Sequence, residues 1–322
     1  MTWMLTGGAG YIGAHVARSL LAAGREVVVL DNMSSGLARK VPEGVPLEQV
    51  DVCDRAAVVE VLRRHRVTGV VHLAAKKAVG ESVERPNYYY RQNVEGSMAL
   101  TEAMVEVGVR RLVYSSSASV YGPTEAPLVT EDTPTLPISP YGQTKLIGEW
   151  IGADLAEAEG FSVVALRYFN VAGAGSDELG DTGAFNLIPM VLRAYTHGER
   201  PMIFGDDYPT PDGTCLRDYI HITDLASGHV SAAVRTEDDV PGFSAFNLGR
   251  GVGSSVREVL DSVSRAVGEP LDAEVVARRA GDPPAIVASA DRAREEMGWV
   301  ASRDLDEMTV SAWSAWQAFP PG

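Results

Sequence analysis

The first half of the chain alternates short apolar runs with longer amphipathic segments. The apolar runs predict strands at residues 3–6, 27–30, 47–52, 70–73, 112–115 and 163–168. The segments between them predict helices near residues 11–23, 55–65, 94–107 and 141–159. Most of these strands are continuous apolar runs rather than alternating ones, which is typical of strands buried on both faces. The pattern therefore predicts an α/β fold, a Rossmann doubly wound parallel sheet with helices on both faces.

The pattern becomes less regular after about residue 172. Residues 173–183 are rich in Gly and Asp, and residues 204–214 are rich in turn formers. Later helices near residues 255–267 and 291–297 accompany shorter strands. We expect a first domain over residues 1–172, to which the chain returns near residues 218–248, and a smaller C-terminal substrate-binding domain over residues 173–322.

Composition and charge narrow the class of protein. The chain has 322 residues, of which 45% are hydrophobic and 22% charged, as in ordinary globular proteins. A net charge of −15 argues against a nucleic-acid or acidic-membrane binder, because phosphates need a basic surface. Cys53 and Cys215 are too few for a disulfide framework or a zinc site. With no apolar run of the ~20 residues that cross a bilayer, and no signal peptide, we expect a cytoplasmic enzyme without a metal.

A glycine-rich loop between the first strand and helix predicts a dinucleotide site. Gly7 permits a tight turn, Gly10 admits a pyrophosphate close to the backbone, and Gly13 allows close packing of helix and sheet. The helix N-terminus offers free N–H groups to the phosphates. Asp31 ends the second strand, where a carboxylate binds the adenosine ribose and repels a 2′-phosphate, so NAD is favoured over NADP. Asp51 and Val52 end the third run and could contact the adenine; alternatively, Asp51 only caps the strand end.

Tyr141 and Lys145 form a candidate catalytic pair. Ser139 and Pro140 predict a helix start, and residues four apart share a helical face. A nearby ammonium favours the phenolate, because a free Tyr has a pKa of about 10 and is a poor base. Ser117 follows a strand in a serine-rich turn, and its hydroxyl can bind a substrate oxygen. Taken singly, the Tyr141–Lys145 pair is equally typical of an exposed helix face, and the serines are equally typical of a polar turn.

Together these features resemble the extended short-chain dehydrogenase/reductases, and within them the UDP-glucose (UDP-galactose) 4-epimerase family. The resemblance covers nearly the whole chain. It rests on GGAGYIG (7–13), HLAAKKAVGES (72–82), SSSASVYG (115–122), YGQTK (141–145), RYFNVAGA (167–174), FGDDYPTPDGTCLRDYIH (204–221) and RRAGDPPA (278–285).

The resemblance implies residue roles. Tyr141 is expected to be the base, Lys145 its electrostatic partner and Ser117 the hydroxyl beside the sugar. The expected cofactor contacts, besides that pair, are Gly7, Gly10, Tyr11, Ile12, Gly13, Asp31, Asn32, Asp51, Val52, Lys77, Asn93 and Tyr168. The expected UDP-sugar contacts, besides Ser117, are Asn170, Asn186, Arg217, Tyr219, Arg279 and Asp282. The two arginines would supply the forked donors that an anionic pyrophosphate needs.

The resemblance also implies an activity: reversible NAD-dependent 4-epimerisation of UDP-galactose and UDP-glucose through a 4-keto intermediate, as in galactose metabolism. NAD is recycled, so no net redox occurs. Members are usually homodimers through the helices near residues 94–107 and 141–159. Leu146, Ile147, Trp150 and Ile151 are candidate seam residues, although they could equally belong to the core.

Other functions remain as alternatives. A 4,6-dehydratase needs an acid–base pair after the strand-end serine, where this chain has Ala118 and Ser119. A 3,5-epimerase/reductase needs a Cys–His pair at the sugar. A non-catalytic NAD sensor would not need the Ser117, Tyr141 and Lys145 set. A related epimerase for UDP-N-acetylhexosamines or UDP-pentoses stays open, because Ile286 has intermediate size where the family's side chain gates N-acetyl groups; we expect a preference for UDP-glucose and UDP-galactose.

Overall fold

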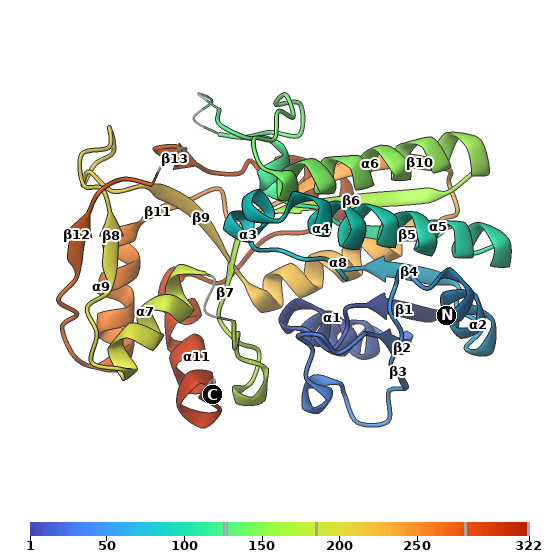
Figure 1. The fold of residues 1–322 in the computed structure, drawn as a ribbon, viewed down its shortest axis with the longest axis horizontal. Helices are drawn as coiled ribbons and strands as arrows, with labels where there is room; N and C mark the ends of the chain where they lie inside the picture. Colours follow the sequence, from blue (N-terminus) through green and yellow to red (C-terminus); the bar gives the residue numbers. More distant parts are fainter. Residues whose placement is uncertain (125, 127, 184–185, 280–281, 321–322) are drawn as a thin grey trace.

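A computed structural model describes residues 1–322 except 125, 127, 184–185, 280–281 and 321–322. Its centre is a seven-stranded sheet in the order β10-β6-β5-β4-β1-β2-β3, which Figure 1 shows from top to bottom. All neighbouring strands are parallel. The strands are β1 (Thr2–Thr6), β2 (Glu26–Leu30), β3 (Leu47–Glu48), β4 (Gly69–His72), β5 (Arg111–Ser115), β6 (Ser162–Tyr168) and β10 (Gly242–Leu248). The predicted α/β fold with a parallel sheet is confirmed.

Helices cover both faces of this sheet. Trp3 and Leu5 of β1 belong to the same core as residues of α1 (Tyr11–Ala22) and α8 (Ile222–Thr236). Met4, between them, belongs to a second core with residues of α2 (Arg55–Arg64) and α5 (Gly96–Val107). Successive residues of a strand point to opposite faces, so burial on both faces requires the unbroken apolar runs of the sequence. α6 (Pro140–Glu159) packs against α5 and the π-helical turn η2 (Tyr90–Glu95).

The order of the strands reverses at β1: β2 and β3 are added on one side of it, and β4, β5 and β6 on the other. In open α/β sheets this switch point opens a crevice at the carboxyl ends of the strands. The shorter elements that border the crevice are α3 (Val79–Glu84), α4 (Pro86–Tyr89) and the 3-10 turns η1 (Ala38–Lys40) and η3 (Ala118–Val120).

Smaller sheets and helices lie beyond the crevice, on the left of Figure 1. Strand β9 (Leu216–His221) pairs with β7 (Asn170–Ala172), β11 (Gly253–Ser255) and β13 (Ala285–Ile286). Strand β8 (Met202–Phe204) pairs with β12 (Glu274–Val276). A separate core joins α7 (Leu187–Thr196), α9 (Val256–Val267) and α11 (Leu305–Ala318). The remaining elements are η4 (Asp177–Leu179) and α10 (Asp291–Met297). The domain boundary at residue 172 stays a prediction.

Two predicted elements were wrong in extent. The strand expected over residues 47–52 ends at Glu48, because β2 ends at its partner Leu30 and offers nothing further to pair with. The helix expected near residues 94–107 is the end of a longer helical stretch that begins at Pro86 and passes through the π-helical turn. Among the described helices, none has the length and apolar character that spanning a membrane requires.

Candidate active site

A cavity of about 1040 Å³ occupies the crevice and is lined from both parts of the molecule. Its floor follows the carboxyl ends of β1, β2, β4, β5 and β6. Most residues predicted for the site line it: Gly7, Gly10, Tyr11, Ile12, Gly13, Asp31, Asn32, Asp51, Val52, Lys77, Ser117, Tyr141, Lys145, Tyr168, Asn170, Asn186, Arg217, Asp282 and Ile286. Sequence segments more than 250 residues apart therefore meet at one site.

The glycine loop forms a close-fitting cradle. Gly7 has a φ of +71°, and a Cβ there would come within 2.9 Å of the Ala74 nitrogen. A Cβ on Gly13 would clash with the carbonyl oxygen of Gly7. Gly10 caps α1 without a side chain, so the first turn of the helix faces the cavity with its backbone. The loop therefore has the form that a phosphate-binding backbone requires.

Asp31 lies at the end of β2 and is 8% exposed. Its carboxylate accepts hydrogen bonds from the N–H groups of Ala9, at 3.1 Å, and Met33, at 2.8 Å. The Asp31 side chain thus ties the glycine loop to the segment after β2, and it lines the cavity as well.

Asn32 and Asp51 are joined by a hydrogen bond of 3.0 Å from the amide of Asn32. Burial acts to raise the pKa of Asp51, but hydrogen bonds from Cys53 and Asn32 outweigh it and hold that pKa below its usual value. Asp51 is therefore a carboxylate at the cavity wall as well as a cap for the chain after β3.

Asn93 differs from the other predicted cofactor contacts, because it is buried behind the cavity wall. Its side chain bonds the N–H and the carbonyl of Lys76 and the hydroxyl of Thr144. Asn93 therefore fixes the loop that carries Lys76 and Lys77 against α6. Lys77 itself lies on the cavity wall.

Tyr141 and Lys145 lie on the first turns of α6, which begins as the sequence predicts. The Ser139 side chain accepts the N–H of Gly142 at 3.1 Å, and Pro140 opens the helix. Burial raises the pKa of Tyr141, and a hydrogen bond with Ser117 opposes that rise. Tyr141, Lys145 and Ser117 all line the cavity.

Lys145 is held by groups that sequence reasoning did not identify. Its Nζ donates to the Ser115 carbonyl at 2.7 Å and lies 5.3 Å from the centre of the Tyr114 ring. Burial lowers the pKa of Lys145 to about 8, which the charge of Glu149 partly offsets. Glu149, one turn further along α6, forms a buried ion pair with Arg167 at 2.6 Å. Its spacing of four from Lys145 is the one sequence signal that could have drawn attention to it.

The predicted substrate residues divide into two groups. Asn170, Asn186, Arg217 and Asp282 line the cavity. The Arg217 guanidinium donates to the Pro283 carbonyl at 2.9 Å and pairs with Asp282 at 3.3 Å. These contacts hold one forked cation at the cavity wall, on β9.

Tyr219 and Arg279 are placed elsewhere. Tyr219 is 5% exposed and belongs to the core with α7 and α9. The Arg279 guanidinium stacks over the Phe204 ring, 3.7 Å from its centre. Residues 280–281, between Arg279 and Asp282, lie outside the described part of the chain. The structure does not bring Tyr219 or Arg279 to the cavity wall, so their substrate roles stay predictions.

Several cavity residues were missed by sequence reasoning. Most of them lie in the segments after β2 and β4, whereas Gln92 lies in η2, Phe169 between β6 and β7, and Asp181 in the loop after β7. Irregular segments have no side-chain periodicity that could indicate a site. They include Ser34, Ser35, Lys40, Ala74, Lys76, Gln92, Phe169 and Asp181. Within the described residues, no cluster of His, Cys, Asp and Glu could hold a metal ion.

A parallel sheet whose glycine loop shares one cavity with a Tyr–Lys pair defines a dinucleotide-dependent enzyme of the Rossmann class. The model of the NAD dependent epimerase/dehydratase family matches residues 3–249. The chain belongs to this family.

Relatives and solved structures agree with that membership. The UDP-glucose 4-epimerase of Azospirillum brasilense is 45% identical over 97% of this chain and 90% of its own. A UDP-glucose 4-epimerase from Stenotrophomonas maltophila, with bound NAD and formylated UDP-arabinopyranose, superposes with a TM-score of 0.94 at 38% identity, over 99% of this chain and 98% of that one. The Bifidobacterium longum enzyme, with NAD⁺ and UDP, gives 0.92 at 37% identity over all of both chains. The resemblance stated from the sequence motifs is confirmed.

Proposed function

We propose that this protein catalyses the reversible NAD-dependent 4-epimerisation of UDP-galactose and UDP-glucose. The observation that carries the proposal is one cavity that is lined by a dinucleotide cradle, a Tyr–Lys–Ser set and Arg217 together. The UDP-glucose 4-epimerases to which the chain is similar support the choice of substrate.

The residues present fit NAD. A Cβ at Gly7 or Gly13 would collide with backbone atoms of the cradle and of the segment after β4, and the backbone of α1 faces the cradle. Asp31 offers a carboxylate where a 2′-phosphate would be repelled. Gly7 to Gly13 would hold the pyrophosphate, Asp31 and Asn32 the ribose, and Asp51 and Val52 the adenine. When bound, NAD supplies a hydride acceptor at carbon 4 of the sugar and then the hydride donor.

Tyr141 handles the proton in the proposed reaction. Its phenolate takes the proton of the sugar's 4-hydroxyl, and loss of the carbon-4 hydride to the acceptor that bound NAD would supply then gives the 4-keto sugar. The phenol returns the proton when the hydride comes back to carbon 4. Burial works against the phenolate by raising the pKa of Tyr141. Ser117 opposes that rise, and the cationic charge of Lys145, held by Ser115, favours the phenolate further. Both groups therefore act against the effect of burial, in the direction that a base near neutral pH requires.

Inversion requires that the keto sugar present its other face to the same hydride position. Strong binding of the nucleotide with loose binding of the hexose suits this step. Arg217 and Asn186 lie on the far cavity wall, where they support a role in holding the UDP group. Arg217 offers a forked donor to phosphate, although it must share its charge with Asp282.

Ile286 bears on the range of sugars. It lies on β13, beside Arg217 of β9, and lines the cavity. A side chain of this size leaves room for a hydroxyl but crowds an N-acetyl group, so we expect UDP-galactose to be preferred over UDP-N-acetylgalactosamine. Equal turnover numbers for the two sugars would contradict this preference.

We also infer that the protein is a homodimer and works in the cytoplasm. Trp150 on α6 is 57% exposed and Met98 on α5 is 47% exposed, which supports an apolar seam over these helices. Ile147 and Ile151 are partly exposed, whereas Leu146 is 6% exposed and belongs to the core. Free Cys53 and Cys215 support a reducing compartment. Sedimentation of wild type and of Trp150→Glu tests the seam; a wild-type monomer would contradict it.

Incubation of the purified protein with UDP-galactose, without added NAD, tests the proposed activity. We expect UDP-glucose to form until both sugars reach equilibrium, because NAD is regenerated in each cycle. A control with NAD added after its removal by partial unfolding and refolding measures the dependence on the cofactor. Turnover that continued in protein free of NAD would contradict the proposal, as would no turnover in fully NAD-loaded protein.

A further inference from the structure

The loop over residues 173–183, which we call the linking loop, is fastened to the cofactor half of the molecule at three points. The Tyr11 hydroxyl donates to the Gly173 carbonyl at 2.5 Å. The Gly175 N–H donates to Nε2 of His15 at 2.9 Å. The Lys40 ammonium donates to the Gly180 carbonyl at 2.6 Å. Each contact joins a side chain near the glycine loop to backbone that runs toward the far cavity wall.

The contacts of His15 fix which nitrogen carries the proton. Its Nδ1 lies 2.8 Å from the Tyr11 carbonyl, which can only accept, so Nδ1 is the donor. Nε2 is then the acceptor that the Gly175 N–H requires, and the ring is neutral. Burial favours that neutral form, since it lowers the pKa of His15 to about 4. His15 is 4% exposed and does not line the cavity, so this arrangement has no direct part in the proposed chemistry.

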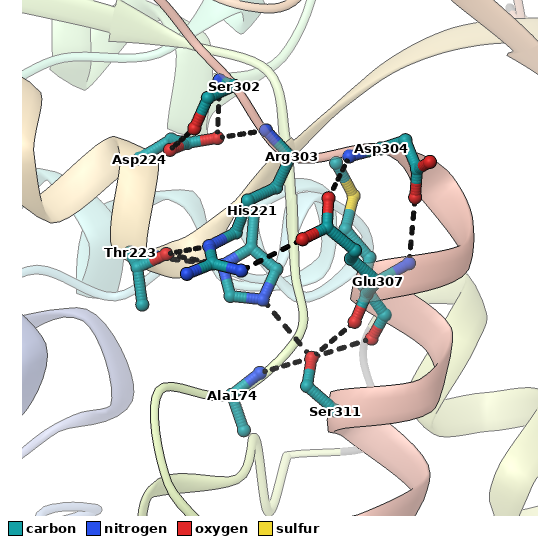
Figure 2. Close-up of polar contacts among 10 residues, drawn as sticks. Ala174, His221, Thr223, Asp224, Ser302, Arg303, Asp304, Glu307 and Ser311 are labelled. Carbon is teal, nitrogen blue, oxygen red and sulfur yellow. Dashed lines mark hydrogen bonds and ion pairs between the residues drawn. The ribbon is translucent and has the colours of Figure 1, made fainter.

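The opposite side of the linking loop is held by α11, as Figure 2 shows. The Ser311 hydroxyl oxygen accepts the N–H of Ala174 at 3.2 Å and lies 3.1 Å from Nε2 of His221. Thr223 lies 2.7 Å from the other ring nitrogen of His221 and accepts from Arg303, which pairs with Glu307. Gly173 leaves no space between these groups, because a Cβ there would come within 2.6 Å of the His221 ring. The backbone at residues 173–175 is therefore clamped from two sides.

The far end of the linking loop reaches the proposed substrate site. Asp181 accepts the N–H of Gly183 at 3.0 Å and the amide of Asn186 at 3.1 Å. Asp181, Thr182, Gly183 and Asn186 all line the cavity. A displacement of the loop at Gly175 or Gly180 would thus move the carboxylate that orients Asn186.

The geometry points to His15 as a positioning residue for the UDP-sugar: through Gly175, the linking loop and Asp181 it holds Asn186 in place from the NAD-binding helix. This inference deepens the proposed function and rests on it, because it gives Asn186 a UDP-sugar to bind. Its consequence is that the helix that cradles the cofactor and the wall that binds the nucleotide sugar move as one unit.

A matched pair of variants at His15 isolates the contact. In His15→Gln the side-chain oxygen can reach the place of Nε2 and accept the Gly175 N–H. In His15→Asn the shorter side chain can still bond the Tyr11 carbonyl but does not reach Gly175. We expect His15→Asn to raise both KM for UDP-galactose and Kd for UDP by about five- to tenfold, the effect of one lost buried hydrogen bond. We expect His15→Gln to stay within about twofold of wild type.

Other readouts separate positioning from a general structural effect. The value of kcat and the NAD content of purified His15→Asn should match wild type. Ser311→Ala, which removes the acceptor of the Ala174 N–H on the other side of the loop, should raise the Kd for UDP in the same direction. The inference is overturned if the Asn and Gln variants behave alike, if Kd for UDP does not change, or if NAD content and kcat fall together with thermal stability.

Calorimetric titration of NAD-loaded protein with UDP keeps the two proposals apart. If wild type binds UDP without epimerising UDP-galactose, the proposed function fails while the comparison of UDP affinities still tests His15. If wild type epimerises and His15→Asn binds UDP as wild type does, only the role of His15 fails.

Discussion

Tyr141 illustrates at the scale of one residue how environment decides chemistry. Its ring is enclosed, so burial raises the pKa of a group that the proposed reaction needs as a base. The cation that should counter this effect, Lys145, is itself buried, and its pKa is lowered to about 8. The Ser115 carbonyl holds the ammonium in place, and the charge of Glu149 favours its protonated form. The sequence predicts the Tyr141–Lys145 pair but not the groups around Lys145, because Ser115 comes from β5 and Glu149 from the next turn of α6.

Tyr141→Phe removes the phenol and leaves the shape of the pocket. We expect kcat for UDP-galactose to fall by about 10²- to 10⁴-fold, the range for loss of a general base. NAD content and UDP affinity should stay at the wild-type level, which steady-state kinetics, cofactor extraction and calorimetry can establish. A variant that kept more than a tenth of the wild-type rate would show that Tyr141 is not the base.

The elements that the sequence predicts well are those with strong local signals. The turn at Gly7, the helix that follows it and the start of α6 at Ser139 each carry their own cap or glycine, and all lie where the pattern places them. Strand β3 is shorter than the strand predicted over residues 47–52, because its length depends on β2. The π-helical turn over residues 90–95 has no local sequence signal that we can identify.

Site residues predicted by resemblance show the same limit. Motif position says that Asn93, Tyr219 and Arg279 belong near the site, but not which way a side chain points. Asn93 turns to Lys76 and Thr144, Tyr219 turns into the core, and Arg279 stacks on Phe204. Those directions depend on tertiary neighbours, which a single sequence does not reveal.

The close fit of the cofactor loop gives a prediction at the scale of an element. Gly13→Ala places a methyl group against the backbone of Gly7 and Gly8, which cannot move without opening the cradle. We expect purified Gly13→Ala to contain little or no NAD and to be inactive. Gly80→Ala is the control, because a Cβ at Gly80 in α3 meets nothing within 4 Å. Extraction of cofactor from both proteins decides the matter; NAD at wild-type levels in Gly13→Ala would contradict the role of the loop.

At the scale of the whole molecule, buried histidines link stability to pH. Burial lowers the pKa of His15, His221 and His229 to about 4 and that of His72 to about 3, from 6.5. Between pH 4 and 6.5 the unfolded chain therefore binds more protons than the native protein, so their contribution to stability is complete above pH 6.5 and is lost as pH falls toward 4. Asp218 acts in the opposite sense, since burial raises its pKa to about 6.

We therefore expect the free energy of unfolding to fall as pH drops from 6.5 to 5. The slope at pH 5 should correspond to roughly two to three protons, each about 1.4 kcal/mol per pH unit. His229→Gln should reduce the slope by about one proton. Urea unfolding across this pH range measures the slope; stability that is constant or rises on acidification would contradict the assignment.

The whole molecule joins a cofactor half and a substrate half around one cavity, and the central claim is a reversible oxidation at carbon 4 without net redox. The most direct test uses UDP-galactose with deuterium at carbon 4, converted in ordinary water. The account predicts UDP-glucose that retains the deuterium at carbon 4, because the hydride is taken up and returned within one closed site. Product in which the deuterium has been replaced by hydrogen from water would contradict it.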